Sequence, residues 1–128
     1  MKIVVLLGRV LYSAMFITAG FHHILNSQSM VGYAASAGVP MANVMVPVSG
    51  VLALIGGLSI LLGFHAKRGA WLIVLFLIPV TFMMHKFWGI ADPQMAMMQM
   101  VNFNKNMAML GGAFLIAFFG SGPYSLKE

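Results

Sequence analysis

The chain has 128 residues, of which 61% are hydrophobic and only 7% are charged. A soluble domain of this length needs many more charges on its surface. The composition therefore excludes a soluble domain and predicts an integral membrane protein. There is no cysteine, which excludes disulfides, Cys-based zinc sites and thiol–disulfide relays. The length allows a single domain, residues 1–128.

The formal charge of +5 comes from seven Lys and Arg residues set against two acids. These cations stand at the ends of apolar segments or inside them, and no basic run occurs. This placement favours a role in topology and contact with anionic membrane lipids, and we expect no nucleic-acid partner.

Four apolar segments are each long enough to cross a bilayer, which takes about 20 residues in a helix. We expect transmembrane helices over roughly residues 3–25, 44–64, 70–88 and 97–119. The first could pass for a signal peptide, but Arg9 interrupts it and no convincing cleavage site follows, so we expect it to be retained. The predicted fold class is all-α, an integral membrane bundle of four transmembrane helices.

Three connections join the predicted spans. Residues 26–40 are polar or small and carry no charge, residues 65–69 form a tight basic turn, and residues 89–94 form a short turn that contains Asp92.

The positions of Lys and Arg predict the orientation of the chain. With four spans, one side of the membrane receives Lys2, Lys67, Arg68 and Lys127. The positive-inside rule assigns that side to the cytoplasm, so both ends of the chain are expected there. Lys86 is the one charge that favours the opposite orientation.

Small residues recur at four-residue intervals in two spans, a spacing that lets helices pack closely in lipid. The second span has Ser49, Ala53 and Gly57 on one face, and the fourth has Ala108 and Gly112. These packing residues could hold the bundle together or form a homo-oligomer, and the sequence leaves both open.

Polar side chains within the spans are costly in lipid, so they are expected to face the interior of the bundle. By the helical period they share one face in each of the first, third and fourth spans. The candidate ligand-binding residues are Arg9, His23, Thr81, His85, Gln99, Asn102, Lys105 and Asn106. We expect most of them to form a polar, basic pocket between these three spans that opens to the outer leaflet, with Arg9 nearer the cytoplasm.

Each candidate also has a structural interpretation. Arg9 could extend to the inner headgroups and Lys105 to the outer ones, because long cationic side chains reach the membrane surface. His23 could be an interfacial residue without a ligand. The asparagines could serve only to join helices by hydrogen bonds.

A metal site at the outer side would need ligands such as His22, His23, His85 and Asp92, because imidazole suits zinc or copper. Methionine is also abundant, but its 13 copies are spread along the chain, and methionine commonly fills apolar helices. No strict ligand spacing is present, so we expect no metal.

An ordered set of short motifs resembles the DoxX family of membrane proteins. The motifs are Gly8-Arg9, Phe16-x-x-x-Gly20-x-x-His23, Ala37-Gly38-Val39-Pro40, Gly56-Gly57-x5-Gly63, His85, Asn106-x4-Gly111-Gly112 and Gly120-x-Gly122-Pro123-x-Ser125-Leu126. Together they cover nearly the whole chain in the right order. The family usually has Lys at the position of His23 and Glu at the position of Ala53, so its set of charges is incomplete here.

The resemblance implies a four-helix protein of the bacterial inner membrane. Some relatives are subunits of a thiosulfate:quinone oxidoreductase, others are associated with membrane oxidoreductase complexes in oxidative-stress defence, and most have no assigned activity. We therefore expect a subunit or accessory of a quinone-linked redox system, with quinone as its ligand, no intrinsic cofactor and an oxidoreductase partner subunit. Whether the chain is itself an enzyme stays open.

Two other functions remain as alternatives. A non-enzymatic membrane scaffold, or a binder of lipid or another small molecule, needs only the pocket, the packing residues and a partner. A small exporter is less favoured, because proton-coupled pumps need a carboxylate within the membrane and the predicted spans contain no Asp or Glu.

Overall fold

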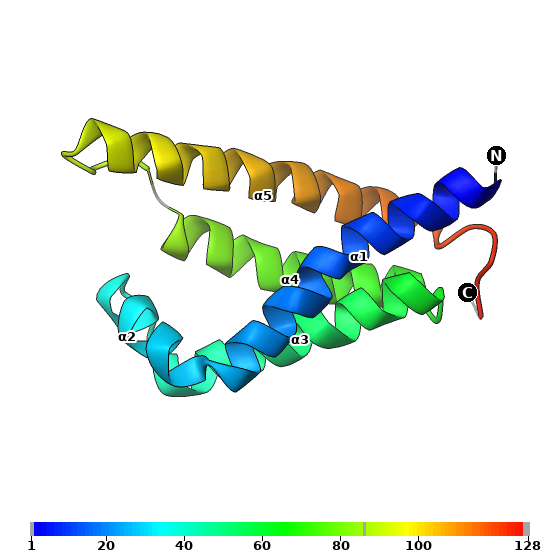
Figure 1. The fold of residues 1–128 in the computed structure, drawn as a ribbon, viewed down its shortest axis with the longest axis horizontal. Coiled ribbons are helices and arrows are strands. Elements are labelled where there is room, and N and C mark those ends of the chain that lie inside the picture. Colours follow the sequence, from blue (N-terminus) through cyan, green and yellow to red (C-terminus); the bar gives the residue numbers. More distant parts are fainter. Residues whose placement is uncertain (1, 86, 127–128) are drawn as a thin grey trace.

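The structure is a computed structural model that describes residues 2–85 and 87–126 (Figure 1). Its described residues form five helices and no strand, so the all-α prediction is confirmed. In chain order the helices are α1 (Lys2–Leu25), α2 (Ser27–Ser36), α3 (Ala42–Leu62), α4 (Ala66–Met84) and α5 (Pro93–Phe119). Lys86 and Lys127, which entered the orientation prediction, lie outside the described residues.

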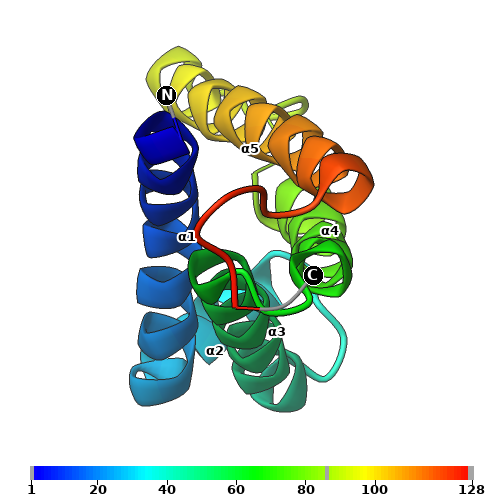
Figure 2. The same ribbon diagram turned by 90° about the vertical axis from the view of Figure 1, so that its right-hand side faces the viewer.

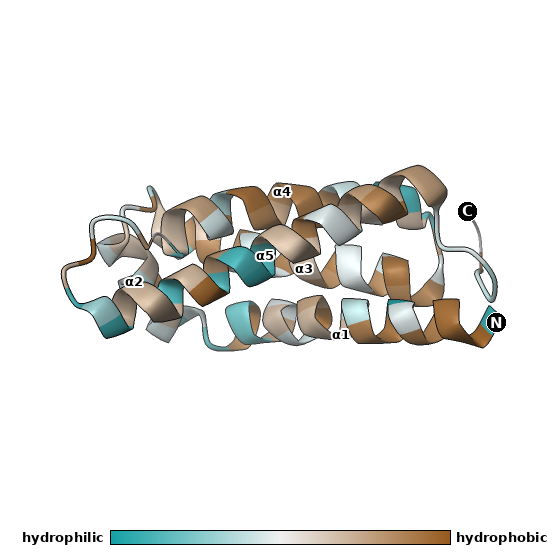
Figure 3. Ribbon diagram, turned by 90° about the horizontal axis from the view of Figure 1, so that it is seen from above, coloured by the Kyte–Doolittle hydropathy of each residue, from teal (hydrophilic) through white to brown (hydrophobic). Residues whose placement is uncertain are grey.

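Three of these helices, α1, α3 and α4, are long and apolar enough to cross a membrane. Helix α5 has 27 residues, a length of about 40 Å, but the glutamines and asparagines of its first half dilute its apolar character. Figure 3 shows this hydrophilic half of α5 beside helices that are largely hydrophobic. The four-span arrangement and its orientation therefore stay predictions.

Helix α2 lies inside the segment that was expected to be a connection, so five helices stand where four were predicted. Its serines, glycine and alanines give no clear helical period. It is held by packing: Ala34 is buried in a small apolar cluster with Ala42 and Val46 of α3, and Met84 of α4 packs against that cluster. Tertiary contact sustains this short helix, which would be marginal alone.

The turn between α3 and α4 is shorter than predicted. Gly63 ends α3 and His65 precedes α4, with positive φ angles of 67° and 52° that reverse the chain within three residues. As a consequence, Lys67 and Arg68 belong to the first turn of α4.

Helix α5 also begins earlier than predicted, at Pro93. The carboxylate of Asp92 accepts a hydrogen bond of 3.0 Å from the backbone amide of Gln94. An aspartate N-cap followed by proline at the first helical position is a strong helix start, because proline needs no hydrogen-bond acceptor there.

Helix α3 is the centre of the bundle, between α1 and α4, and α5 packs along α4 (Figure 2). Both described ends of the chain and the α3–α4 turn lie at one end of the bundle, which we call the terminal end (Figure 1). Helix α2 and the α4–α5 connection lie at the opposite end, the α2 end.

Glycines let α3 approach both of its neighbours at backbone distance. A Cβ atom at Gly20 of α1 would lie 2.8 Å from the carbonyl oxygen of Gly50. On the other side of α3, a Cβ at Gly56 would lie 2.9 Å from the carbonyl oxygen of Gly69 in α4. Any side chain in these seams would push the helices apart.

The residues predicted to pack helices together differ in their surroundings. Ala53 is fully buried, and a Cβ at Gly57 would lie 2.9 Å from the side chain of Ile17. On α5, Ala108 is exposed, whereas a Cβ at Gly112 would lie 2.9 Å from the ring of Tyr12.

Arg9 binds the C-terminal tail, residues 120–126, to the bundle. Its side chain is only 4% exposed, so it does not extend to lipid headgroups. The guanidinium donates five hydrogen bonds of 2.6–3.2 Å, to the carbonyl oxygens of Leu61, Ser121, Pro123 and Tyr124 and to the hydroxyl of Ser125. Figure 2 shows the tail crossing from α5 toward α1 and α3.

We expect Gly20→Ala to lower the free energy of unfolding by about 1–3 kcal/mol, because the added methyl group would force α1 away from α3. Gly8→Ala is the matched control: it lies on the same helix, and a Cβ there would meet nothing within 4 Å. The control should be neutral or slightly stabilising. Unfolding in mild detergent, followed by circular dichroism, measures both, and equal stabilities would contradict a tight seam.

Arg9→Gln should release the C-terminal tail and cost on the order of 3 kcal/mol of stability, because several carbonyl groups lose a charged donor. The readout is the rate at which carboxypeptidase digests the purified protein. Lys2→Gln removes an exposed charge from the same helix and should leave that rate unchanged. A wild-type rate for Arg9→Gln would mean that other contacts hold the tail.

Candidate functional site

A cavity of about 520 Å³ lies at the α2 end, between α1, α2, α3 and α4. Most of its lining is apolar, from methionine, valine, leucine and proline side chains. Its hydrogen-bonding side chains are His23, Tyr33, Ser49 and His85. A largely apolar cavity with a few placed polar groups is the usual form of a small-molecule site.

Two successive residues of α3 position His23. A Cβ at Gly50 would lie 2.8 Å from the Cβ of His23, so glycine allows α1 to bring the histidine this close. The hydroxyl oxygen of Ser49 lies 2.8 Å from Nδ1 of His23. The ring of Phe76 packs against the imidazole, with centroids 5.7 Å apart. The imidazole is therefore held on both its edge and its face.

The Ser49 hydroxyl sets the tautomer of His23. Its single proton is donated to the carbonyl oxygen of Val46, 2.6 Å away. Toward His23 the Ser49 oxygen is then an acceptor, so Nδ1 carries the proton. In a neutral imidazole this leaves a lone pair on Nε2, which can accept a hydrogen bond or a proton from a ligand.

A second set of hydrogen-bonded side chains joins α2, α5 and the end of α4. Nδ1 of His85 donates to the side-chain oxygen of Gln99 at 3.0 Å, since an amide oxygen can only accept. The amide nitrogen of Gln99 donates to the hydroxyl of Tyr33 at 3.1 Å. Having accepted this bond, Tyr33 retains its own proton for an acceptor on a ligand.

Three of the predicted ligand-binding residues belong to this site. His23 and His85 line the cavity, and Gln99 joins His85 to Tyr33. The cavity differs in position from the expected pocket, because α2 and α3 form much of its wall and α5 contributes only through Gln99.

The other five predicted residues lie elsewhere. Thr81 and Asn106 are 2% and 5% exposed, but neither lines the cavity. On α5, Asn102 is half-buried and Lys105 is exposed. Arg9 is at the terminal end, where it binds the tail.

Two residues of the site were not predicted as ligand-binding. Tyr33 falls on α2, which had no signal as a helix. Ser49 was expected to pack helices, yet its hydroxyl holds His23. The sequence did contain a signal for Ser49: a hydroxyl on the same face as Ala53 and Gly57 points into the bundle and needs a partner there.

Within residues 2–85 and 87–126, no three His, Cys, Asp or Glu side chains come together as a metal site would require. Nδ1 of His22 lies 3.2 Å from the side-chain nitrogen of Asn26. Asp92 caps α5.

Comparisons with known proteins identify a family and two relatives. The family model described as DoxX matches residues 4–86. Inner membrane protein YphA of Escherichia coli (strain K12) is 27% identical over 126 residues, which cover 98% of this chain and 89% of that protein. Inner membrane protein YqjF of the same organism is 34% identical over 124 residues, covering 97% and 89%. No solved structure matches.

Three apolar helices and relatives named as inner membrane proteins confirm the predicted location, a multi-pass protein of the bacterial inner membrane. The motif resemblance is confirmed as well, because the family model covers more than half of the sequence. The chain belongs to the DoxX family.

Proposed function

We propose that this chain is a membrane subunit or accessory of a quinone-linked redox system and that the cavity at the α2 end binds a quinone or quinol. One observation carries the proposal: an apolar cavity contains both a hydrogen-bond acceptor, Nε2 of His23, and a hydroxyl donor, Tyr33. A quinol presents hydroxyl groups and a quinone presents carbonyl groups, so the two forms need these complementary partners.

The proposed chemistry is proton transfer at His23. A quinol hydroxyl would donate to Nε2, and the imidazole would take the proton as the quinol is oxidised. Oxidation to the quinone releases two protons and two electrons: His23 takes one proton, the other passes to water, and both electrons pass to an acceptor. The chain has no cysteine to hold an iron–sulfur cluster, so we assign the transfer of electrons to a partner oxidoreductase.

We further propose four transmembrane helices with both ends of the chain in the cytoplasm. Lys2, Lys67 and Arg68 lie at the terminal end, together with both described ends of the chain (Figure 1). Helix α5 is long enough to cross and returns along α4 to that end. In this orientation the cavity lies in the outer half of the bilayer.

A binder of lipid or another small molecule, without redox chemistry, is the second candidate. It is favoured by the apolar wall of the cavity, where side chains such as Met30, Met45 and Leu52 suit an acyl chain as well as a quinone tail. An exporter has less support, because Asp92 is the only acid among the described residues and it caps α5 outside the apolar spans.

Quinone that co-purifies with the protein tests the first proposal. The protein is purified in mild detergent and extracted with organic solvent, and quinones are quantified by mass spectrometry. His23→Leu should lower the bound quinone about tenfold, the effect of one lost hydrogen bond to the ligand. Lys105→Gln, which removes an exposed charge outside the cavity, should leave it unchanged.

Either of two results would contradict the redox proposal. Quinone could be missing from the wild-type protein although the cells contain it in abundance, or its amount could be the same in His23→Leu. Phospholipid found in place of quinone, and reduced by the same variant, would support the second candidate.

The proposed topology can be tested with single cysteines, because the natural chain has none. A membrane-impermeant maleimide should label Ala91→Cys, in the α4–α5 connection, from the outer side of an intact inner membrane. It should label Lys67→Cys only after that membrane is made permeable. The reverse pattern would overturn the proposed orientation, and labelling of both sites from outside would exclude the α4 span.

A further inference from the structure

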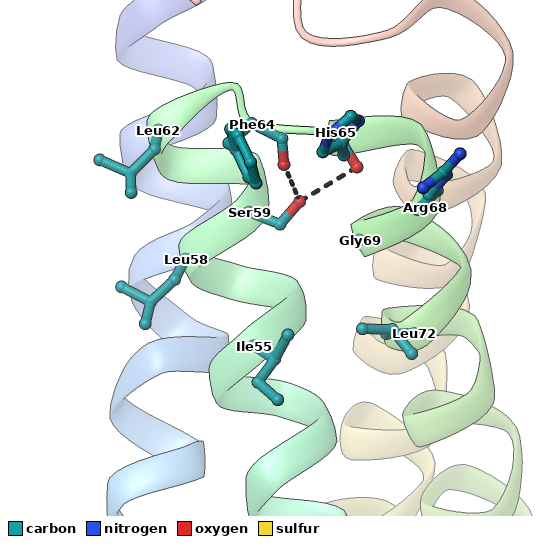
Figure 4. A pocket seen from close by; sticks show the side chains of 9 residues that line it. All are labelled: Ile55, Leu58, Ser59, Leu62, Phe64, His65, Arg68, Gly69 and Leu72. Atoms are coloured by element: carbon teal, nitrogen blue, oxygen red, sulfur yellow. Dashed lines mark hydrogen bonds between the residues drawn. The ribbon is translucent and has the colours of Figure 1, made fainter. Parts of the chain in front are cut away.

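A second hollow, of about 360 Å³, lies at the terminal end in a groove between α3 and α4. Figure 4 shows Ile55 and Leu72 reaching toward each other from the two helices, with the rings of Phe64 and His65 closing the end at the α3–α4 turn. Arg68 stands beside that closed end, on the first turn of α4. The groove is thus apolar along its length and cationic at one end.

The inner wall of the groove offers no spare polar group. Helices α3 and α4 come so close that a Cβ at Gly69 would collide with the side chain of Ser59. The Ser59 hydroxyl turns to the backbone of the turn, where it lies 2.6 Å from the carbonyl oxygen of Phe64 and 3.1 Å from that of His65 (Figure 4). A hydrocarbon chain can therefore lie against this wall without covering an unsatisfied polar group.

The cationic end has no anion of its own in the described part of the chain. Arg68 is exposed, and the only acid described, Asp92, caps α5 at the opposite end of the bundle. No side chain caps the start of α4, so the amides of its first turn add partial positive charge beside Arg68. This end therefore attracts an anion of the kind that a lipid phosphate provides.

We propose that this groove binds an anionic phospholipid, with the phosphate at Arg68 and His65 and one acyl chain against Ile55 and Leu72. Charge complementarity favours an anionic headgroup, because the cation in the headgroup of a zwitterionic lipid offsets the attraction between its phosphate and Arg68. From Ile55 to Leu62 the groove follows α3 for about 10 Å, enough for the upper half of an acyl chain. This site lies at the opposite end of the bundle from the cavity and does not depend on the quinone proposal.

The depth of the groove also fits a lipid. Its cationic end coincides with the start of α4, where that apolar helix would enter the membrane. Trp71 is exposed about one turn further along α4, and tryptophan prefers the level of the lipid headgroups. The phosphate and the cation would therefore meet at the same depth.

Native mass spectrometry of the full chain, released from detergent with equal amounts of phosphatidylglycerol and phosphatidylcholine, tests the proposal. We expect phosphatidylglycerol to be retained in preference. Arg68→Gln should lower the retention of phosphatidylglycerol about fivefold, because one basic residue near the membrane surface strengthens the binding of an anionic lipid by roughly that factor. Lys67→Gln is the matched control, because this neighbouring exposed cation does not line the groove.

Two more variants separate a specific site from general charge attraction. Arg68→Lys keeps the charge and should restore most of the retention, which also shows that loss in Arg68→Gln is not a failure to fold. Leu72→Trp fills the groove and should lower retention with all charges in place. Equal losses in Arg68→Gln and Lys67→Gln, unchanged retention in Leu72→Trp, or equal retention of the two lipids would each overturn the proposal.

Discussion

The arrangement of this bundle depends on one buried cation. Arg9 lies within an apolar helix, 4% exposed, and the described residues give it no carboxylate partner. A buried charge needs partners for its donors, and here backbone carbonyl groups of the tail and of Leu61 accept from the two terminal nitrogens of the guanidinium. The third nitrogen, Nε, is buried without a hydrogen-bond partner among the described residues. Those carbonyls belong to residues outside regular helix or at the end of α3. The charge of Arg9 therefore determines the path of the tail, and it links the N-terminal helix to the C-terminal tail across α3.

The second constraint is the closeness of α3 to both neighbours, and it leads directly to the cavity. Along α1 the glycine seam runs from Gly57 to Gly50, where it meets His23. One residue before Gly50 is Ser49, where α3 has a side chain in place of another glycine. The hydroxyl of Ser49 binds the imidazole of His23. The cavity therefore begins where the seam ends, and α2, the connection that follows it and the second half of α4 form the remaining walls. Stability and a polar site are built from consecutive residues of one helix.

The sequence predicted what depends on composition and local rules, and it failed where distant segments meet. Long apolar runs located α1, α3 and α4, and small residues located the interior face of α3. The start of α5 could have been predicted, since Asp92 and Pro93 form an ordinary helix start. Helix α2 could not, because packing of Ala34 sustains it. The helical period put the polar residues of α5 on one face but could not say which helices that face meets, so Asn106 and Lys105 were assigned to the same pocket as His23.

The two departures from the family's pattern are related in space. Ala53 lies one helical turn from Ser49 on the same face of α3, and Ser49 binds His23. The motif resemblance implies Glu at the position of Ala53 and Lys at the position of His23, two side chains whose charges would neutralise each other. A chain with only one of the two would contain a buried, unpaired charge. The present chain has neither, and a histidine held by a serine stands at the position where the resemblance implies the cation. Under the proposed function this exchange matters, because a lysine offers a fixed charge at neutral pH whereas a histidine can accept and release a proton there.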